Sequence, residues 1–288
     1  MELLMNLKNF FSRTRKGDFR QAHAREKTVP LKLPTDKEKI GWISPFYSQS
    51  RAIELDPNVL ANNRLVAMIP DSPEIDFYKV LRTRIQHHTN GQGGLSIMIT
   101  SALPGEGKTV TSINLALTFA MEYEHTVLLV DGDLRMQRIH EMMGYESDKG
   151  LLDYLLGKCP LSDLIVWPGV EKFTVISGGR RTYESSEIIN SPRMRELVEE
   201  MKSRYPKRYV IFDVPPVLAG ADAMDFAALV DWIIVVVRAG QTSMQDVNRA
   251  LQLLPAEKLL GLILNGQTSQ FGDFPYRYGY GRYSPRPS

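Results

Sequence analysis

Short apolar runs alternate with longer amphipathic stretches along most of the chain. Six runs rich in Val, Ile and Leu stand at LSIMITS, HTVLLVD, FTVISG, RYVIFDV, DWIIVVV and LLGLILN. Continuous apolar runs of this length are typical of parallel strands buried on both faces, with the intervening stretches forming helical crossovers. The pattern therefore predicts an α/β fold, a doubly wound and mostly parallel sheet with helices on both faces.

The polar stretches divide the chain into three parts. Residues 1–68 are polar and broken by prolines, so we expect a loosely structured extension, with apolar residues at near-helical spacing over residues 1–16. That opening fits an amphipathic helix on a membrane surface, a helix docked on protein or a frayed terminus. Residues 69–270 contain all six apolar runs and form the predicted folded domain. In residues 271–288 glycines and prolines interrupt any strand, which predicts a flexible tail.

Composition bears on whether the protein binds nucleic acid and on where in the cell it is located. The chain carries 35 Lys and Arg against 33 Asp and Glu, a net charge of +2, so no global positive field favours nucleic acid. The one cysteine, Cys159, cannot form an internal disulfide, and no apolar run is long enough to span a bilayer. We therefore expect no nucleic-acid partner and a cytoplasmic location.

A glycine-rich segment, SALPGEGKT, joins the first strong strand pattern to a helical stretch. In such a segment glycines let the backbone approach an anion, Lys108 reaches the outer phosphates, and the Thr109 hydroxyl can ligate magnesium. The strict pattern has glycine where this chain has Ala102, and a solvated turn is the alternative. We predict a P-loop for a nucleotide and Mg²⁺. Its expected nucleotide contacts are Pro104, Gly105, Glu106, Gly107, Lys108, Thr109, Val110 and, after the last strand pattern, Asn265, which also fits a simple turn.

Acidic side chains follow two further strand patterns. Asp131 and Asp133 come after TVLLV, and Asp213 ends RYVIFD. Because ligands lie at the carboxyl ends of parallel strands, these acids are expected to converge on the P-loop, although each taken alone fits a helix N-cap. Lys108 and the three acids are the predicted catalytic residues. Thr109, Asp131 and Asp213 are the predicted metal ligands.

The motifs occur in a specific order. SALPGEGKT, VLLVDGDLR, GLLDYLLG, VIFDVPPVL and LGLILNG follow one another, and over residues 69–283 the chain resembles the bacterial tyrosine kinases (BY-kinases) of exopolysaccharide and capsule assembly, a branch of the deviant Walker P-loop ATPases. The resemblance implies an ATP-dependent protein-tyrosine autokinase and makes residues 69–270 its P-loop kinase domain. It assigns Asp131 and Asp133 to the variant second Walker motif and Asp213 to the Walker B strand. The implied phosphoacceptors, on a neighbouring subunit, are Tyr276, Tyr278, Tyr280 and Tyr283.

The chemistry of a phenol agrees with this acceptor role. Its pKa of about 10 keeps it neutral at pH 7, so it must lose a proton as it attacks phosphorus. A nearby carboxylate assists that loss, and Asp131 and Asp133 are both candidates for the base.

The resemblance also implies partners. Members of the family carry Glu-x2-Arg-x2-Arg in the helix before the P-loop, at a subunit interface, and this chain offers Asp76, Lys79 and Arg82 there. We expect a homo-oligomeric ring, a separate transmembrane chain-length regulator that activates the kinase, and a cognate tyrosine phosphatase. The kinase would then lie at the inner face of the cell membrane through that regulator.

Three other functions fit parts of the same sequence. A partition or division-site ATPase shares the fold, but the lysine that marks those proteins is replaced here by Leu103. A nucleotide-gated scaffold without catalysis conflicts with the intact P-loop lysine and acids. A nucleic-acid binder would stack bases on the Tyr/Arg tail, without help from a basic excess in the rest of the chain. The kinase is therefore the favoured hypothesis.

Overall fold

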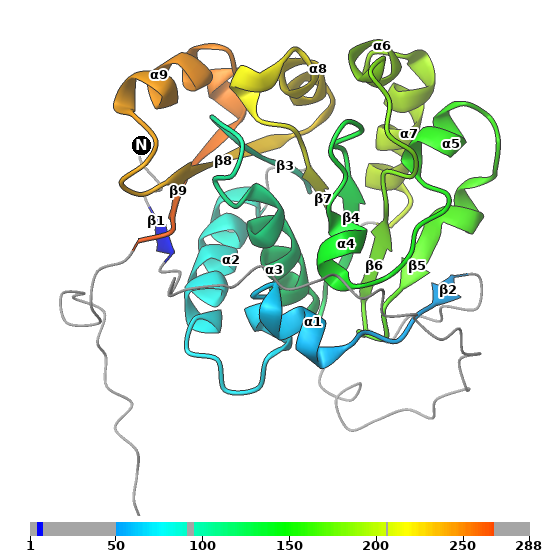
Figure 1. Ribbon diagram of the computed structural model, residues 1–288, viewed down its shortest axis with the longest axis horizontal. Helices are drawn as coiled ribbons and strands as arrows, with labels where there is room; N and C mark the ends of the chain where they lie inside the picture. Colours follow the sequence, from blue (N-terminus) through cyan, green and yellow to red (C-terminus); the bar gives the residue numbers. More distant parts are fainter. Residues whose placement is uncertain (1–4, 8–49, 91–94, 206, 268–288) are drawn as a thin grey trace, which may run out of the picture.

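The computed structural model describes residues 5–7, 50–90, 95–205 and 207–267 of the chain. Its strands are β1 (Met5–Leu7), β2 (Arg51–Ala52), β3 (Ser96–Ser101), β4 (Thr126–Asp131), β5 (Ile165–Trp167), β6 (Phe173–Ile176), β7 (Arg208–Asp213), β8 (Trp232–Arg238) and β9 (Leu259–Asn265). Within the described residues they form one sheet in the order β1-β9-β8-β3-β7-β4-β6-β5-β2 (Figure 1). Neighbouring strands are parallel, except that β5 and β6 are antiparallel. Each of the six apolar runs contains a strand, which confirms the predicted mostly parallel α/β fold.

Helices cover both faces of this sheet (Figure 1). One face packs against α1 (Pro57–Asn62), α2 (Ile75–Thr89), α3 (Lys108–Ala120) and α4 (Ile139–Met143). The other packs against α5 (Leu151–Leu155), α6 (Ser185–Ile189), α7 (Pro192–Ser203), α8 (Asp222–Leu229) and α9 (Met244–Gln252). Single 3₁₀ turns occur at η2 (Val66–Met68), η3 (Leu161–Leu164), η4 (Val217–Ala219) and η5 (Ala256–Lys258). The fold is thus doubly wound, as predicted.

Capping residues explain where two of the surface helices begin. The Ser191 hydroxyl accepts the backbone N–H of Met194, and Pro192 occupies the first turn of α7, where its missing N–H costs nothing. The Ser243 hydroxyl likewise accepts the backbone N–H of Asp246 at the start of α9. These hydrogen bonds determine where α7 and α9, two helices of the second face, begin.

The core divides between the two faces because successive strand side chains point to opposite sides. In β3, Ile97 and Ile99 belong to the core cluster shared with α2 and α3, whereas Met98 packs with the helices of the other face. All three side chains are fully buried. Each such burial stabilises the fold by about 1.5–3 kcal/mol relative to an exposed position. The central strands therefore form a rigid support for the residues at their carboxyl ends.

Residues 50–68 depart from the loosely structured extension expected of them. They contain β2, α1 and η2, and Leu60 and Leu65 belong to the core under α3. The side chain of Asn114 in α3 joins the two parts, because its Oδ1 accepts the backbone N–H of Ala67 at 3.1 Å and its Nδ2 donates to the carbonyl of Arg64 at 3.0 Å. A few well-spaced apolar residues and one buried amide thus tie this polar segment to the domain.

A strand stands at residues 5–7, where the opening helix was expected. Met5–Leu7 pairs in parallel with Ile263–Asn265 at the end of β9. The other residues of the expected helix, and the whole of the predicted tail 271–288, lie outside the described residues.

None of the helices in the described ranges combines the length and the apolar character that crossing a membrane requires.

Candidate active site

The turn between β3 and α3 has the backbone conformation that a phosphate loop needs. Gly105 and Gly107 have φ angles of +84° and +92°, which side-chain-bearing residues rarely adopt. A Cβ on Gly107 would lie 2.0 Å from Nδ2 of Asn265, whereas a Cβ on Gly105 would meet nothing within 4 Å. The loop leads directly into α3 at Lys108, and the first N–H groups of a helix are free to bind an anion. Sequence and conformation therefore agree on an anion cradle.

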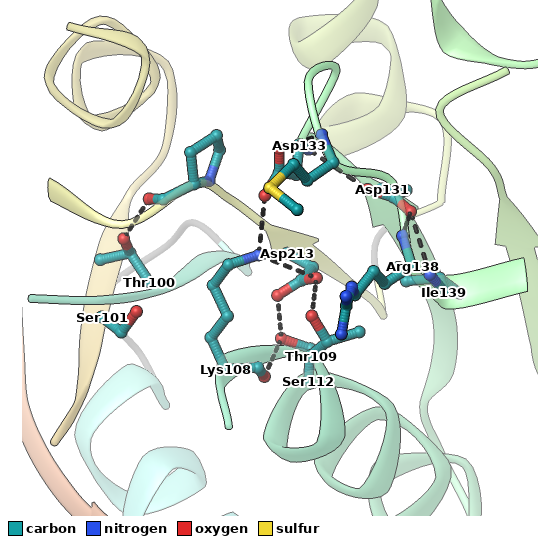
Figure 2. Close-up of polar contacts among 12 residues, drawn as sticks. Thr100, Ser101, Lys108, Thr109, Ser112, Asp131, Asp133, Arg138, Ile139 and Asp213 are labelled. Atoms are coloured by element: carbon teal, nitrogen blue, oxygen red, sulfur yellow. Dashed lines mark hydrogen bonds and ion pairs between the residues drawn. The ribbon is translucent and has the colours of Figure 1, made fainter. Parts of the chain in front are cut away.

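Lys108 lies between two of the predicted acids (Figure 2). Its Nζ is 3.0 Å from Oδ2 of Asp133 and 3.5 Å from Oδ2 of Asp213, and its side chain is only 13% exposed. Burial by itself would lower the pKa of Lys108, but the attraction of Asp213 and Asp133 outweighs it and raises that pKa. The second oxygen of Asp133 accepts the backbone N–H of Met136 at 2.8 Å. The lysine is therefore held as a cation at the mouth of the cradle.

The start of α3 holds Asp213, the last residue of β7. The Thr109 hydroxyl donates to Oδ2 of Asp213 at 2.7 Å, and the Ser112 hydroxyl donates to Oδ1 at 3.1 Å. Burial raises the pKa of Asp213, and the neighbouring Lys108 offsets only part of that rise. Sequence analysis missed Ser112, although its position three residues after Thr109 places both hydroxyls on one helix face.

Asp131 shapes the loop that carries Asp133. Its Oδ1 accepts the backbone N–H of Asp133 at 3.2 Å, and its Oδ2 accepts those of Arg138 and Ile139, both at 3.1 Å (Figure 2). The side chain is completely buried and stands opposite Asp213 across the β4–β7 pair. Burial, and then the charge of Asp213, raise the pKa of Asp131 to about 8. The three acids thus converge as predicted, but Asp131 is turned toward backbone rather than toward the cradle opening.

Two of the predicted nucleotide contacts, Glu106 and Asn265, are turned inward. The Glu106 carboxylate is 2% exposed and accepts the backbone N–H groups of Leu103 (2.8 Å) and Arg238 (3.3 Å) and the hydroxyl of Thr242. Nδ2 of Asn265, also 2% exposed, donates to the carbonyl of Glu106 at 2.8 Å. In this structure both side chains brace the P-loop against the ends of β8 and β9. An adenine contact by Asn265 stays a prediction.

Comparison with known proteins places this site in a family. A family model described as an AAA domain matches residues 95–258. The chain is 33% identical over 234 residues to tyrosine-protein kinase YwqD of Bacillus subtilis, which covers 80% of this chain and 95% of that protein. Among solved structures, the kinase domain of Escherichia coli tyrosine kinase ETK has a TM-score of 0.67 and 32% identity, over 75% of this chain and 84% of that chain. The chain belongs to the bacterial tyrosine kinase family.

The chain is also similar to part of a longer protein. The succinoglycan biosynthesis transport protein ExoP of Rhizobium meliloti is 29% identical over 278 residues, which cover 88% of this chain but 34% of that protein. The chain thus spans almost all of YwqD and about a third of ExoP. The predicted family is confirmed, and its P-loop fold identifies this kinase family member as a nucleotide-binding protein.

The three predicted interface residues of this kinase differ in availability. Asp76 and Lys79 are 75% and 47% exposed and form an ion pair with each other at 2.9 Å within one turn of α2. Arg82 is only 14% exposed, donates to the carbonyl of Thr118 in α3 at 2.9 Å and pairs with Glu122. Arg82 is therefore bound within its own chain. The predicted phosphoacceptor tyrosines all lie in the tail outside the described residues.

Proposed function

We propose that this kinase transfers the γ-phosphoryl group of ATP to tail tyrosines of a neighbouring copy, and that this transfer regulates the polymerisation and export of an exopolysaccharide or capsule. The observation that carries the proposal is the contact of Lys108 with Asp133 and Asp213 beside the P-loop. Relatives named as tyrosine-protein kinases, and one named for succinoglycan biosynthesis and transport, support the reaction and its setting.

The oxygen groups beside the P-loop suit a magnesium ion bound together with phosphates. In the described part of the chain no group of three or more His, Cys, Asp or Glu residues could hold a metal by itself. Mg²⁺ is usually bound through one or two carboxylates, waters and substrate phosphates rather than by an all-protein cage. The Thr109 hydroxyl and the Asp213 carboxylate, already 2.7 Å apart, would hold it. Bound there, the ion would neutralise charge on the phosphates.

Asp133 is the better candidate for the base. Asp131 is fully buried and its oxygens accept three backbone N–H groups, so it acts as a positioning residue. Oδ2 of Asp133 instead accepts a hydrogen bond from Nζ of Lys108. When Lys108 turns to the phosphates, that oxygen is released and can accept the phenolic proton as the tyrosine oxygen bonds to phosphorus. ADP leaves with the electron pair of the broken β–γ bond.

The length of sequence between β9 and the first tail tyrosine supports an acceptor role. β9 ends at Asn265, at the same edge of the sheet as the P-loop, and the first tail tyrosine is Tyr276. Eleven residues span at most roughly 35–40 Å, so a tail can reach its own site or that of an adjoining copy. Transfer between copies is the choice that the family resemblance favours. Phosphorylation would add up to about two negative charges per tyrosine to a tail that carries Arg277, Arg282 and Arg286.

The further partners follow from the family setting. We propose a ring of identical subunits, activation by a separate transmembrane chain-length regulator, removal of phosphate by a tyrosine phosphatase, and a location at the inner face of the membrane through the regulator. A relative named as a succinoglycan biosynthesis transport protein supports this setting.

A mixing experiment tests both the reaction and its direction. One chain lacks residues 275–288 but keeps its site, and the other carries Lys108→Met but keeps its tail. Incubation with ATP and Mg²⁺ should place several phosphates on the Lys108→Met chain, as measured by intact mass and peptide mapping. ATP hydrolysis without phosphotyrosine, in a wild-type sample treated in the same way, would instead support the partition-type ATPase.

A matched pair of acid substitutions tests the base. Asp133→Asn should lower the rate of phosphotyrosine formation by a factor of about 10²–10⁴. Asp163→Asn removes the same charge from η3, before β5, where the side chain is 43% exposed beside Lys149, and should leave the rate unchanged. Equal rates in both variants would remove Asp133 from the mechanism.

A further inference from the structure

Arg138 presents a guanidinium group at the active site that the proposed function does not use. Its backbone N–H is fixed on Oδ2 of Asp131 at 3.1 Å, so the residue is anchored at the rim of the site. Figure 2 shows its side chain directed from that rim toward the side of the site formed by Thr109 and Ser112. The side chain is exposed, so the guanidinium is accessible to a ligand entering the cradle.

The neighbouring arginines are already paired. Arg135, on the same loop, and Arg180 and Arg181, on the loop after β6, each contact a carboxylate of this chain at 2.8–3.1 Å. Among the described residues, the Arg138 guanidinium has no hydrogen bond and no ion pair. It is thus the arginine of these two loops that remains available for a bound anion.

Local structure gives no reason for an arginine at this position. Residue 138 is the N-cap of α4, and its side chain makes no capping hydrogen bond. Ser, Thr, Asp and Asn are the preferred N-caps, and a cation beside a helix N-terminus is unfavourable. The bond to Asp131 uses only the backbone N–H, which any residue except proline supplies. The side chain therefore contributes nothing visible to the fold.

The charge of the site favours a second cation. The Asp133 and Asp213 carboxylates both contact Lys108, so the charge of this lysine is already balanced before a nucleotide enters. A triphosphate that enters an acid-lined site needs positive charge, and arginine offers a planar fork that matches phosphate oxygens. We propose that Arg138 binds the γ-phosphoryl group of the nucleotide and stabilises the charge on it during transfer. This rests on the proposed function for the identity of the nucleotide.

The role leaves the balance of the reaction unchanged. The bond between the γ-phosphorus and the bridging oxygen breaks, the bond between phosphorus and the tyrosine oxygen forms, and the phenolic proton goes to Asp133. Arg138 forms and breaks no covalent bond in this step. Its contribution is hydrogen bonds and charge at the transferred group, as with the arginines that assist other phosphoryl transfers.

Nucleotide affinities separate this role from a structural one. The full chain is compared with Arg138→Gln, Arg138→Lys and, as a control on the adjacent loop, Arg181→Gln. Calorimetry measures the dissociation constants of ADP and of the non-hydrolysable analogue AMP-PNP, each with Mg²⁺. Arg138→Gln should weaken AMP-PNP binding about tenfold and leave ADP binding within about twofold, because only AMP-PNP carries a γ-phosphoryl group. The rate of transfer should fall about 10²–10³-fold.

The other variants and outcomes complete the test. Arg138→Lys should recover part of the AMP-PNP affinity, since lysine keeps the charge without the fork. Arg181→Gln should match the wild type. Equal losses of ADP and AMP-PNP affinity in Arg138→Gln, or no loss of either, would overturn the role of Arg138. A wild-type ratio of the two affinities together with a lowered melting temperature would also overturn it. If the wild type binds both nucleotides but forms no phosphotyrosine, the proposed function fails, while the ratio still decides the role of Arg138.

Discussion

Replacement of Glu106 by alanine should destabilise the protein, although this residue stands in the middle of the phosphate loop. Its buried carboxylate accepts hydrogen bonds from Leu103 within the loop, from Arg238 at the end of β8 and from Thr242 just after that strand. Alanine removes the acceptor of the Leu103 N–H and of the Thr242 hydroxyl, and leaves the Arg238 N–H with only its second acceptor, the Thr242 hydroxyl oxygen at 3.2 Å. Hydrogen bonds to a charged group contribute about 1.5–3 kcal/mol each and are not additive, so we expect a total loss of about 2–5 kcal/mol.

The loss should be visible in both stability and binding. For a domain of this size it corresponds to a fall in melting temperature of about 5–15 °C. Nucleotide affinity should fall as well, because the loop loses the Glu106 hydrogen bond to β8 and is left with the contact of the Arg238 guanidinium with the Gly105 carbonyl. Glu106→Gln keeps an acceptor oxygen and should lose less. Glu257→Ala, an exposed glutamate in η5, serves as the control. A free energy of unfolding for Glu106→Ala within about 0.5 kcal/mol of that control would refute the bracing role.

Three further predictions concern the loop, the buried acids and α2. Gly107→Ala places a Cβ 2.0 Å from Nδ2 of Asn265 at a φ of +92°. The variant should therefore unfold at a lower temperature, as measured by circular dichroism, and calorimetry should detect no nucleotide binding. Because the pKa of Asp131 is about 8 in the folded state and about 4 when unfolded, the nucleotide-free protein holds a proton that unfolding releases, and its stability should fall from pH 4 to pH 8. Urea unfolding of Asp131→Asn across that range should show a shallower fall, and equal slopes would argue against the shifted pKa. Arg82→Ala should lower the free energy of unfolding by about 1–3 kcal/mol without changing nucleotide affinity. Light scattering on the same samples measures the oligomeric state.

The main sheet could be predicted because its strands are long and buried. Every run of six or more residues that is apolar on both faces, such as WIIVVV, became a central strand. β2 and β5 have only two and three residues, too few for a periodic signal. The Pro-Gly pair at residues 168–169, just after β5, was the one local sign of its antiparallel return to β6. The packing of residues 50–68 depends on Asn114, about fifty residues away, and no local pattern reveals such a contact.

The site could be predicted only as far as strand ends determine it. Asp133 and Asp213 approach Lys108 because the carboxyl ends of parallel strands share one edge of the sheet. The direction of each side chain is decided by its neighbours in space. Glu106 and Asn265 face inward because backbone groups from distant segments lie there to be satisfied. The sequence therefore identified the residues of the loop but not which of them brace it.

The predicted subunit interface on α2 is a second place where neighbours in space decide what a side chain contacts. A spacing of three residues places Asp76, Lys79 and Arg82 on neighbouring turns, which a sequence shows as one charged stripe. The stripe is split in the structure, because α3 lies against α2 on the side of Arg82. The carbonyl of Thr118 in α3 and the carboxylate of Glu122, just after α3, bind that guanidinium. Asp76 and Lys79 remain at the surface, where their mutual ion pair contributes at most about 1 kcal/mol and can be exchanged for contacts with another subunit. An effect of Arg82 substitutions on assembly would thus reach the interface through the α2–α3 packing, whereas an effect of Lys79 substitutions would report a direct contact.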